Sequence, residues 1–177
     1  MSRGDWMRTR SGGRFYPADP RPEEMKILDL ASGVARECRF GGQMEGWCSV
    51  AEHSVLVAEV LPPHLKLQGL MHDTPEGLVR DMTRPNKMLL PDYRALEDRV
   101  WRAICPAFGL PYELDPLVKV ADDAVLLAER MQLFPGDRED WTIKGEPAPV
   151  KIMQLDYREA EELFLYHFHN LTNGAFQ

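Results

Sequence analysis

The stretch SVAEHSVLVAEVLPPHLKLQGLMHDTPEGLVRDM, residues 49–82, decides the fold that the sequence predicts. Ser49 can cap a helix whose third position is Glu52, so the first part predicts a helix over 50–60. Two consecutive prolines then stop this helix. Apolar residues that recur at spacings of three and four predict the next helix over 67–82. A short turn between the two favours an antiparallel pair of helices.

The same periodicity continues on both sides of this pair and predicts further helices over 23–36, 93–108, 117–134 and 157–171. The sequence shows no alternating strand pattern of useful length. It therefore predicts an all-α fold of about six helices that pack as a single unit. In the 117–134 helix, the apolar stripe expected to face the core comprises Leu117, Val120, Ala121, Ala124, Leu127, Ala128 and Met131.

The remaining segments are predicted to be irregular. Residues 1–22 mix glycine, proline and arginine without periodicity, which favours an N-terminal arm that pairs a short strand or two. Residues 83–91 and 135–149 are predicted to be a linker and a polar loop. The helical domain is thus expected to span 23–177.

Composition limits the classes of protein to consider. The 177 residues, 44% hydrophobic and 28% charged, suit one globular domain. The formal charge of −7 lacks the basic character of a protein that binds duplex nucleic acid. No apolar run reaches the roughly 18 residues of a membrane span, and Ser-Arg-Gly-Asp follows Met1 where a secretory signal needs apolar residues. The expectation is a cytoplasmic protein that contacts no membrane.

The three cysteines, Cys38, Cys48 and Cys105, argue against a disulfide framework and against a thiolate zinc site. Their number is odd and no two of them share a CxxC spacing. The expectation is three reduced thiols.

Two helices of the predicted bundle carry candidate metal ligands. His53 lies in the first turns of the 50–60 helix, and His72-Asp73 lies in the middle of the next one. Two imidazoles and a carboxylate that meet between antiparallel helices are ligands for a divalent metal. Glu76 lies on an adjoining part of the same helix face, where it could orient or deprotonate a water. The alternative for each is an ordinary core histidine or a solvated charge.

A fourth ligand is expected from Asp122-Asp123 in the 117–134 helix. On a helical wheel Asp123 falls close to Lys119 and Arg130, two cations that can satisfy it at the surface. Asp122 falls nearest Glu129 at the edge of the apolar stripe, where an unpaired carboxylate is unfavourable unless a metal or proton neutralises it. Asp122 is therefore the predicted ligand, with Asp123 as the alternative.

The order of His53, then His72-Asp73, then Asp122 resembles the H…HD…D signature of the HD-domain metal-dependent phosphohydrolases. The resemblance runs from about residue 27 to 134. It includes the segments RFGG, SVAEHS, MHDTPEGLVRDM, RPNK and VKVADDAVLLAER, which are similar to small bacterial 5'-deoxynucleotidases and phage-type HD hydrolases. In that family the fold is a single helical bundle.

The resemblance also implies roles for individual residues. The four residues of the signature would hold the metal, Glu76 would activate water, and Asp81 would be a supporting or substrate-side carboxylate. Arg39 and Lys87 match cations that the family places near the substrate phosphate, a task that suits a guanidinium; Arg84 is a weaker candidate. Phe40 and Trp47 flank the same glycine-rich loop and could stack on a nucleobase, or simply pack.

The implied activity is metal-dependent hydrolysis of a nucleotide phosphate. Two reactions fit: removal of the 5'-phosphate of a dNMP and removal of phosphate or triphosphate from a dNTP. The implied cofactor is a divalent ion (Co, Mn, Zn, Fe, Ni or Mg), the partner is the nucleotide, and analogy predicts a homo-oligomer, in the host cytoplasm if a phage encodes it. Gln43 stands where phage-type relatives often carry a histidine. The alternative is a non-catalytic HD-fold module that binds a nucleotide or a partner.

Overall fold

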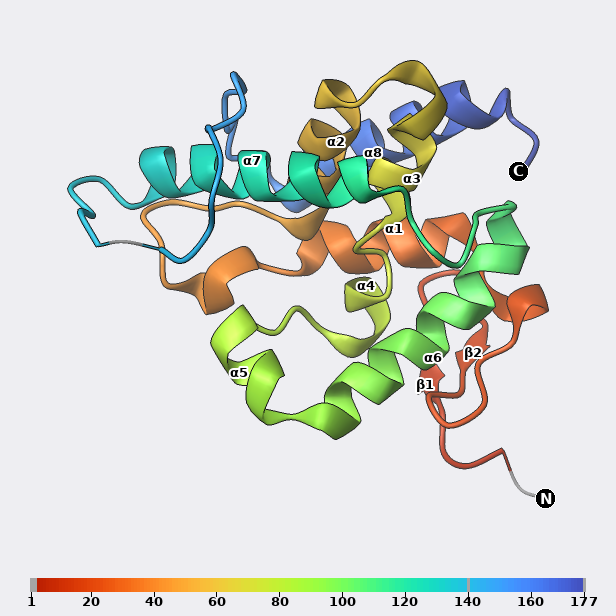
Figure 1. The fold of residues 1–177 in the computed structure, drawn as a ribbon. Helices are drawn as coiled ribbons and strands as arrows, with labels where there is room; N and C mark the ends of the chain where they lie inside the picture. The colour runs from red at the N-terminus through yellow and green to blue at the C-terminus, as the bar shows by residue number, and fades with distance from the viewer. Residues whose placement is uncertain (1–2, 140, 177) are drawn as a thin grey trace.

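The fold is mostly helical, as predicted (Figure 1). The computed structural model describes residues 3–139 and 141–176. The strands are β1 (Met7–Arg8) and β2 (Arg14–Phe15), an antiparallel pair in the N-terminal arm. The α-helices are α1 (Ile27–Arg36), α2 (Val50–Val60), α3 (Lys66–Met71), α4 (Glu76–Val79), α5 (Arg84–Leu89), α6 (Pro91–Phe108), α7 (Pro116–Leu133) and α8 (Tyr157–Thr172). Short 3-10 turns cover Pro22–Glu24, Arg39–Gly42 and Pro63–Leu65.

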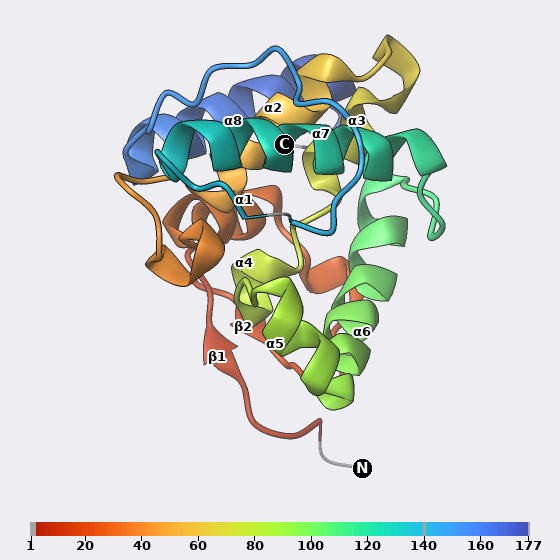
Figure 2. The same ribbon diagram turned by 60° about the vertical axis from the view of Figure 1, so that its left-hand side comes forward.

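Helix α2 is the centre of the bundle, because it packs against α1, α3, α7 and α8. Helix α4 packs on α1 and lies between α7 and α5 in both ribbon views (Figure 1, Figure 2). The sequence explains the position of α2: nine of its residues, Val50 to Ala58, are buried. No helix in the described part of the chain is long and apolar enough to cross a membrane.

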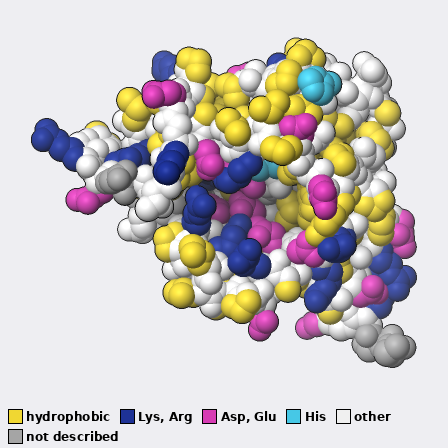
Figure 3. All heavy atoms as spheres, in the orientation of Figure 1, with side chains coloured by type: hydrophobic (Ala, Val, Ile, Leu, Met, Phe, Trp, Pro, Cys, Tyr) yellow, Lys and Arg dark blue, Asp and Glu magenta, His cyan; other side chains and the backbone are white. Residues whose placement is uncertain are grey.

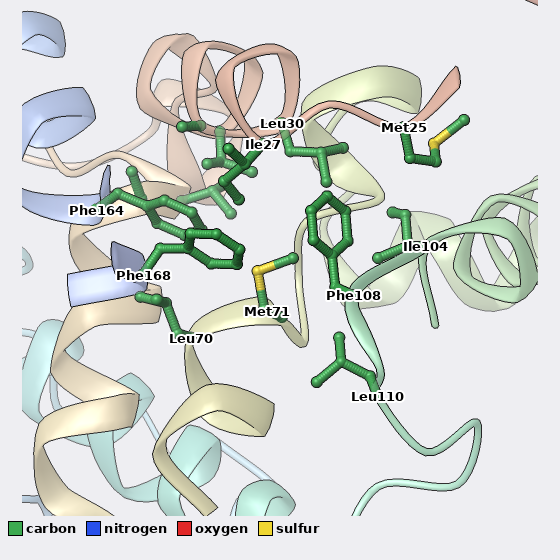
Figure 4. Packing of buried hydrophobic residues seen from close by; sticks show 14 of the residues in the cluster. Met25, Ile27, Leu30, Leu70, Met71, Ile104, Phe108, Leu110, Phe164 and Phe168 are labelled. Atoms are coloured by element: carbon green, nitrogen blue, oxygen red, sulfur yellow. The ribbon is translucent and has the colours of Figure 1, made fainter. Parts of the chain in front are cut away.

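The main core lies among α1, α2, α3, α6 and α8. Phe108 and Phe168 meet edge to face there, with ring centroids 5.6 Å apart. Figure 4 shows Met71, the last residue of α3, between these two rings. Because Met71 is packed in the core, it fixes the position at which the next residues, His72 and Asp73, begin.

Ser49 caps α2 as predicted. Its hydroxyl accepts a hydrogen bond from the Glu52 backbone N–H at 3.1 Å. The Glu52 side chain does not complete a capping box, because its carboxylate instead accepts the backbone N–H groups of residues 153–155. This contact holds the segment before α8 against α2.

Replacing Ser49 by alanine is expected to lower the free energy of unfolding by about 1 kcal/mol, the usual effect of losing an N-cap. Urea unfolding followed by circular dichroism measures it. Ser54, which lies inside α2 and makes no such cap, is the control position. An equal loss for Ser54→Ala would contradict a specific capping effect.

The predicted helix over 67–82 is wrong, because residues 72–75 form a turn between α3 and α4. Pro75 has no N–H to continue the helical ladder. The Met71 carbonyl instead accepts the backbone N–H and the hydroxyl of Thr74, at 3.1 and 2.6 Å. His72 and Asp73 therefore lie in a tight turn rather than in the middle of a helix. Helix α4 ends before Arg80, whose φ is 83°.

Three other predictions need correction. The helix predicted from residue 23 begins at Ile27, after the 3-10 turn. The predicted linker contains α5, whose Pro85 suits a first helical turn. In α7 the predicted core stripe is partly exposed, because the buried face turns toward α2 through Val118, Ala121, Val125, Ala128 and Leu133, and leaves Leu117, Val120 and Met131 exposed.

Two glycines determine how closely α4 approaches α1. A Cβ atom on Gly33 of α1 would lie 2.2 Å from the Gly77 carbonyl oxygen, and one on Gly77 would lie 2.8 Å from the Val34 nitrogen. Backbone therefore touches backbone at this crossing. The contact fixes the position of Glu76, the residue before Gly77.

Gly77→Ala is expected to lower the free energy of unfolding by about 1–3 kcal/mol through overpacking, although alanine is the better helix former. The midpoint of urea unfolding reports the loss. An unchanged midpoint would mean that the two backbones do not touch.

Candidate metal centre

Four side chains from three parts of the chain converge beside α2. They are His53 of α2, His72 and Asp73 of the turn after α3, and Asp122 of α7, and one ligand atom from each lies within 4.8 Å of the others. The His53 Nε2 atom lies 3.1 Å from Asp122 Oδ1, and His72 Nε2 lies 3.2 Å from Asp73 Oδ2. Sequence analysis predicted the same four residues as a ligand set. The structure brings them together.

The hydrogen bonds of the two imidazoles leave one nitrogen of each facing the cluster. The Nδ1 atom of His72 lies 2.7 Å from the Gly69 carbonyl oxygen, which can only accept, so Nδ1–H donates. His53 Nδ1 likewise faces a carboxylate oxygen of Glu129 at 2.8 Å. Both Nε2 atoms are buried and form no hydrogen bond with the described residues. The carboxylate oxygens of Asp122 and Asp73 lie 3.1 and 3.2 Å from them, and a metal ion bound between these groups would be coordinated by both nitrogens.

The charges of the cluster perturb its pKa values in a consistent way. Burial opposes protonation of His53, but Glu129 and Asp122 outweigh it and raise the pKa of the imidazole to about 9. Burial also opposes the charged form of Asp122, but the histidines hold the pKa of its carboxyl well below the usual value. Without a metal, protons on imidazole therefore balance the carboxylates. A divalent cation would take over that role and release protons.

Lys119 binds both members of the aspartate pair. Its Nζ lies 2.6 Å from Asp122 Oδ2 and 2.7 Å from Asp123 Oδ1. The prediction that Asp122 has no cation is therefore wrong, because Lys119 lies one turn before both residues. Only Asp122 joins the cluster, through its Oδ1 atom.

Glu76 lies at the edge of the cluster, at the start of α4. It is 4% exposed, its Oε1 atom lies 3.1 Å from Lys87 Nζ, and its Oε2 atom is buried without a hydrogen-bond partner among the described residues. Burial raises the pKa of the Glu76 carboxyl, and the negative charges of Asp73 and Asp81 raise it further. The pKa of Asp81 is also raised by burial. A carboxylate with a raised pKa is a stronger proton acceptor than an ordinary surface carboxylate.

Arg39 is not an ordinary solvated cation. It is 8% exposed, and its Nε and Nη2 atoms donate to Glu129 Oε2 at 3.0 and 2.9 Å. Its remaining terminal nitrogen, Nη1, lies 3.8 Å from Asp73 Oδ2. The sequence alone indicates no role for Glu129, although the helical wheel places it beside Asp122.

The two predicted stacking residues differ in their surroundings. Phe40, with a left-handed φ of 55°, packs edge-on against Phe134 and Trp141, with centroid distances of 5.1 and 6.1 Å. The ring of Trp47 is not part of this aromatic cluster in the described structure, and its backbone N–H donates to Gln154 Oε1 at 3.3 Å. Of these two residues, Phe40 is the one next to Arg39 in sequence, and the Arg39 guanidinium lies 5.3 Å from the centre of its ring.

Acidic side chains gather in a hollow between α7 and α5, and basic side chains surround it (Figure 3). Within the cluster, Asp73 and Asp122 keep 24% and 18% of their side-chain surface exposed. His53, in contrast, is fully buried. The four candidate ligands thus include one fully buried residue and two that are partly open to solvent.

Two known proteins resemble this chain over most of its length. The uncharacterised protein YfdR of Escherichia coli is 32% identical over 170 residues, covering 94% of this chain and 96% of YfdR. The chain belongs to the YfdR family. A second relative, an uncharacterised protein of Rhodobacter capsulatus, is 37% identical over 169 residues and covers 86% of both chains. No family model matches the chain.

Proposed function

We propose that this member of the YfdR family is a metal-dependent phosphohydrolase of the HD-domain type that acts on nucleotides. The observation that carries the proposal is the cluster of His53, His72, Asp73 and Asp122, in which two buried imidazole nitrogens face carboxylate oxygens but form no hydrogen bond with the described residues. Imidazole and carboxylate ligands together suit a first-row divalent ion. The four residues would hold that ion, and the opening of the cluster admits a substrate.

A divalent ion held there would lower the pKa of water and polarise a phosphoryl group. Glu76 is placed to accept the proton of the attacking water, because its Oε2 atom is unpartnered and its pKa is raised by burial. Asp81, whose backbone N–H is held by Glu37 at 3.2 Å, contributes negative charge on the same side. Lys87, held between Glu76 and Glu97, supplies a cation for phosphate oxygens.

The substrate class follows from charge and from aromatic groups. Lys87 and Arg39 approach the acidic cluster from α5 and from the glycine-rich loop, which suits a phosphate group. Phe40, next to Arg39, adds an aromatic surface for a base. We propose a nucleotide substrate, with the 5'-phosphate of a dNMP or the phosphates of a dNTP as the cleaved group.

A product-resolved assay tests this function. The metal-stripped protein is refilled with Co, Mn, Zn or Mg and incubated with each common dNMP, dNDP and dNTP. Inorganic phosphate from a monophosphate indicates a nucleotidase, and nucleoside plus triphosphate indicates a triphosphohydrolase. Metal binding without turnover of any nucleotide would favour the non-catalytic nucleotide-binding module.

Removal of metal is expected to lower the melting temperature. A ligand present at about 100 times its Kd adds about 2.7 kcal/mol, which corresponds to about 5–10 °C for a chain of this size. Thermal melting with and without EDTA measures the shift. Asp122→Asn, which lacks a ligand, is the control and should lose the EDTA effect. If EDTA does not change the melting temperature of the metal-loaded wild type, the result contradicts the metal site.

A further inference from the structure

The carboxylate of Glu129 is the only group in the described structure that contacts both His53 and Arg39 through hydrogen bonds. It lies on α7, two turns after Asp122, and is fully buried. Its Oε1 atom lies 2.8 Å from His53 Nδ1 and 3.6 Å from the Cys48 thiol. Its Oε2 atom accepts both Nε–H and Nη2–H of Arg39. Both oxygens are therefore fully used.

We propose that Glu129 is a positioning residue that links metal binding to anion binding, by fixing the ring of His53 and the guanidinium of Arg39 at once. The inference rests on the proposed function, since it assumes that the cluster holds a metal and that Arg39 receives an anion. It adds a residue that is neither a ligand nor a substrate contact.

The first half of the proposal concerns His53. A carboxylate accepts hydrogen bonds and cannot donate them, so Glu129 keeps a proton on Nδ1 and directs Nε2 toward Asp122 and the other ligands. Carboxylates in this position fix the ring and raise its basicity as a metal ligand. His72 receives the same support from a neutral carbonyl, that of Gly69. Only His53 is supported by a charged group.

The second half concerns Arg39. Two of its nitrogens are bound to Glu129, which leaves Nη1 facing the cluster, 3.8 Å from Asp73 Oδ2. The two hydrogen bonds to Glu129 thus fix the plane of the guanidinium without any contact to the substrate. Burial of the Glu129 charge is unfavourable by itself, and its pairing with Arg39 offsets this.

Glutamine cannot replace Glu129 in both tasks. Its amide has one acceptor oxygen, whereas His53 and Arg39 each require an acceptor. Glu129→Gln must leave one of the two without its partner while keeping the size of the side chain. The substitution therefore tests the link with little change in packing.

The test measures three properties of wild type, Glu129→Gln and Asp123→Asn, which alters a half-buried carboxylate on the same helix. Melting of the metal-free proteins checks folding. Competition with a chelator gives the Zn²⁺ affinity, which is expected to fall about 10–100-fold in Glu129→Gln and to stay unchanged in Asp123→Asn. Titration of the zinc-saturated proteins with inorganic phosphate is expected to give binding about tenfold weaker in Glu129→Gln.

Distinct outcomes overturn distinct claims. Wild-type protein that binds no divalent ion overturns the proposed function and this inference together. Wild-type and Glu129→Gln proteins with equal affinity for Zn²⁺ and for phosphate overturn the inference alone. If Glu129→Gln does not fold, nitrogen NMR of histidine-labelled, zinc-loaded wild type decides: we expect Nδ1 of His53 to keep its proton, and zinc on Nδ1 would refute the role of Glu129.

Discussion

Replacing Asp122 by asparagine is expected to lower the affinity for divalent metal ions by more than about 100-fold, whereas Asp123→Asn leaves it within about fivefold. The two residues are neighbours on α7 and share Lys119 as a partner. They differ in one respect: Asp122 Oδ1 lies 3.1 Å from His53 Nε2, and Asp123 does not reach the cluster. The asparagine side chain keeps the shape but removes the charge that a metal ligand needs.

The matched pair separates a metal ligand from a surface charge. Both substitutions remove one negative charge from the same helix, so a general electrostatic effect would appear in both. Competition with a chelator gives the affinity, and cobalt absorption reports whether the ligand set has changed. Loss of metal binding in Asp123→Asn, with binding retained in Asp122→Asn, would show that Asp123 and not Asp122 is the ligand.

The sequence predicted the convergence of the four ligands for reasons that hold locally. Ser49 and the two prolines set the limits of α2, which places His53 on a buried helix. On α7 the wheel placed Asp122 at the edge of the apolar stripe and favoured it over Asp123, which stayed the alternative. These arguments cover His53 and Asp122, whereas His72 and Asp73 were expected in the middle of a helix and were supported as ligands by the resemblance to HD-domain proteins.

The break after α3 could not be predicted from periodicity alone. The apolar pattern of 67–82 continues across it, and Pro75 can also occupy a first helical turn. Whether the helix breaks here depends on the close contact between Gly77 and α1. The chain makes this contact when α4 turns away from α3. That contact joins residues distant in sequence, so no local rule contains it.

The exposed stripe of α7 was mispredicted for a similar reason. Two apolar stripes run along this helix, and only packing against α2 decides that Val118 and Val125 are buried while Val120 is exposed. The contacts of Glu129 also depend on that choice. Once the face with Asp122 is known to point inward, a carboxylate seven residues later must point inward too.

Glu76→Gln is expected to lower the rate of nucleotide hydrolysis by about 10²–10⁴-fold and to leave metal affinity unchanged. Glu76 is not one of the four converging ligands, so metal retention does not depend on it. Glutamine fits the same space and can still accept from Lys87, but it cannot take up a proton. Steady-state kinetics on the best substrate, with metal content measured in parallel, gives both quantities.

Glu97→Gln is the control that distinguishes proton transfer from an effect on Lys87. Lys87 Nζ contacts Glu97 Oε1 at 2.7 Å and Glu76 Oε1 at 3.1 Å, so either substitution removes one charged partner of the same cation. If Glu76 only held Lys87 in place, the two variants would lose similar rates. Proton acceptance requires the unpartnered Oε2 atom of Glu76, and we expect Glu97→Gln to lose no more than about fivefold. A fully active Glu76→Gln enzyme would remove this carboxylate from the reaction and leave Asp81 as the next acceptor to test.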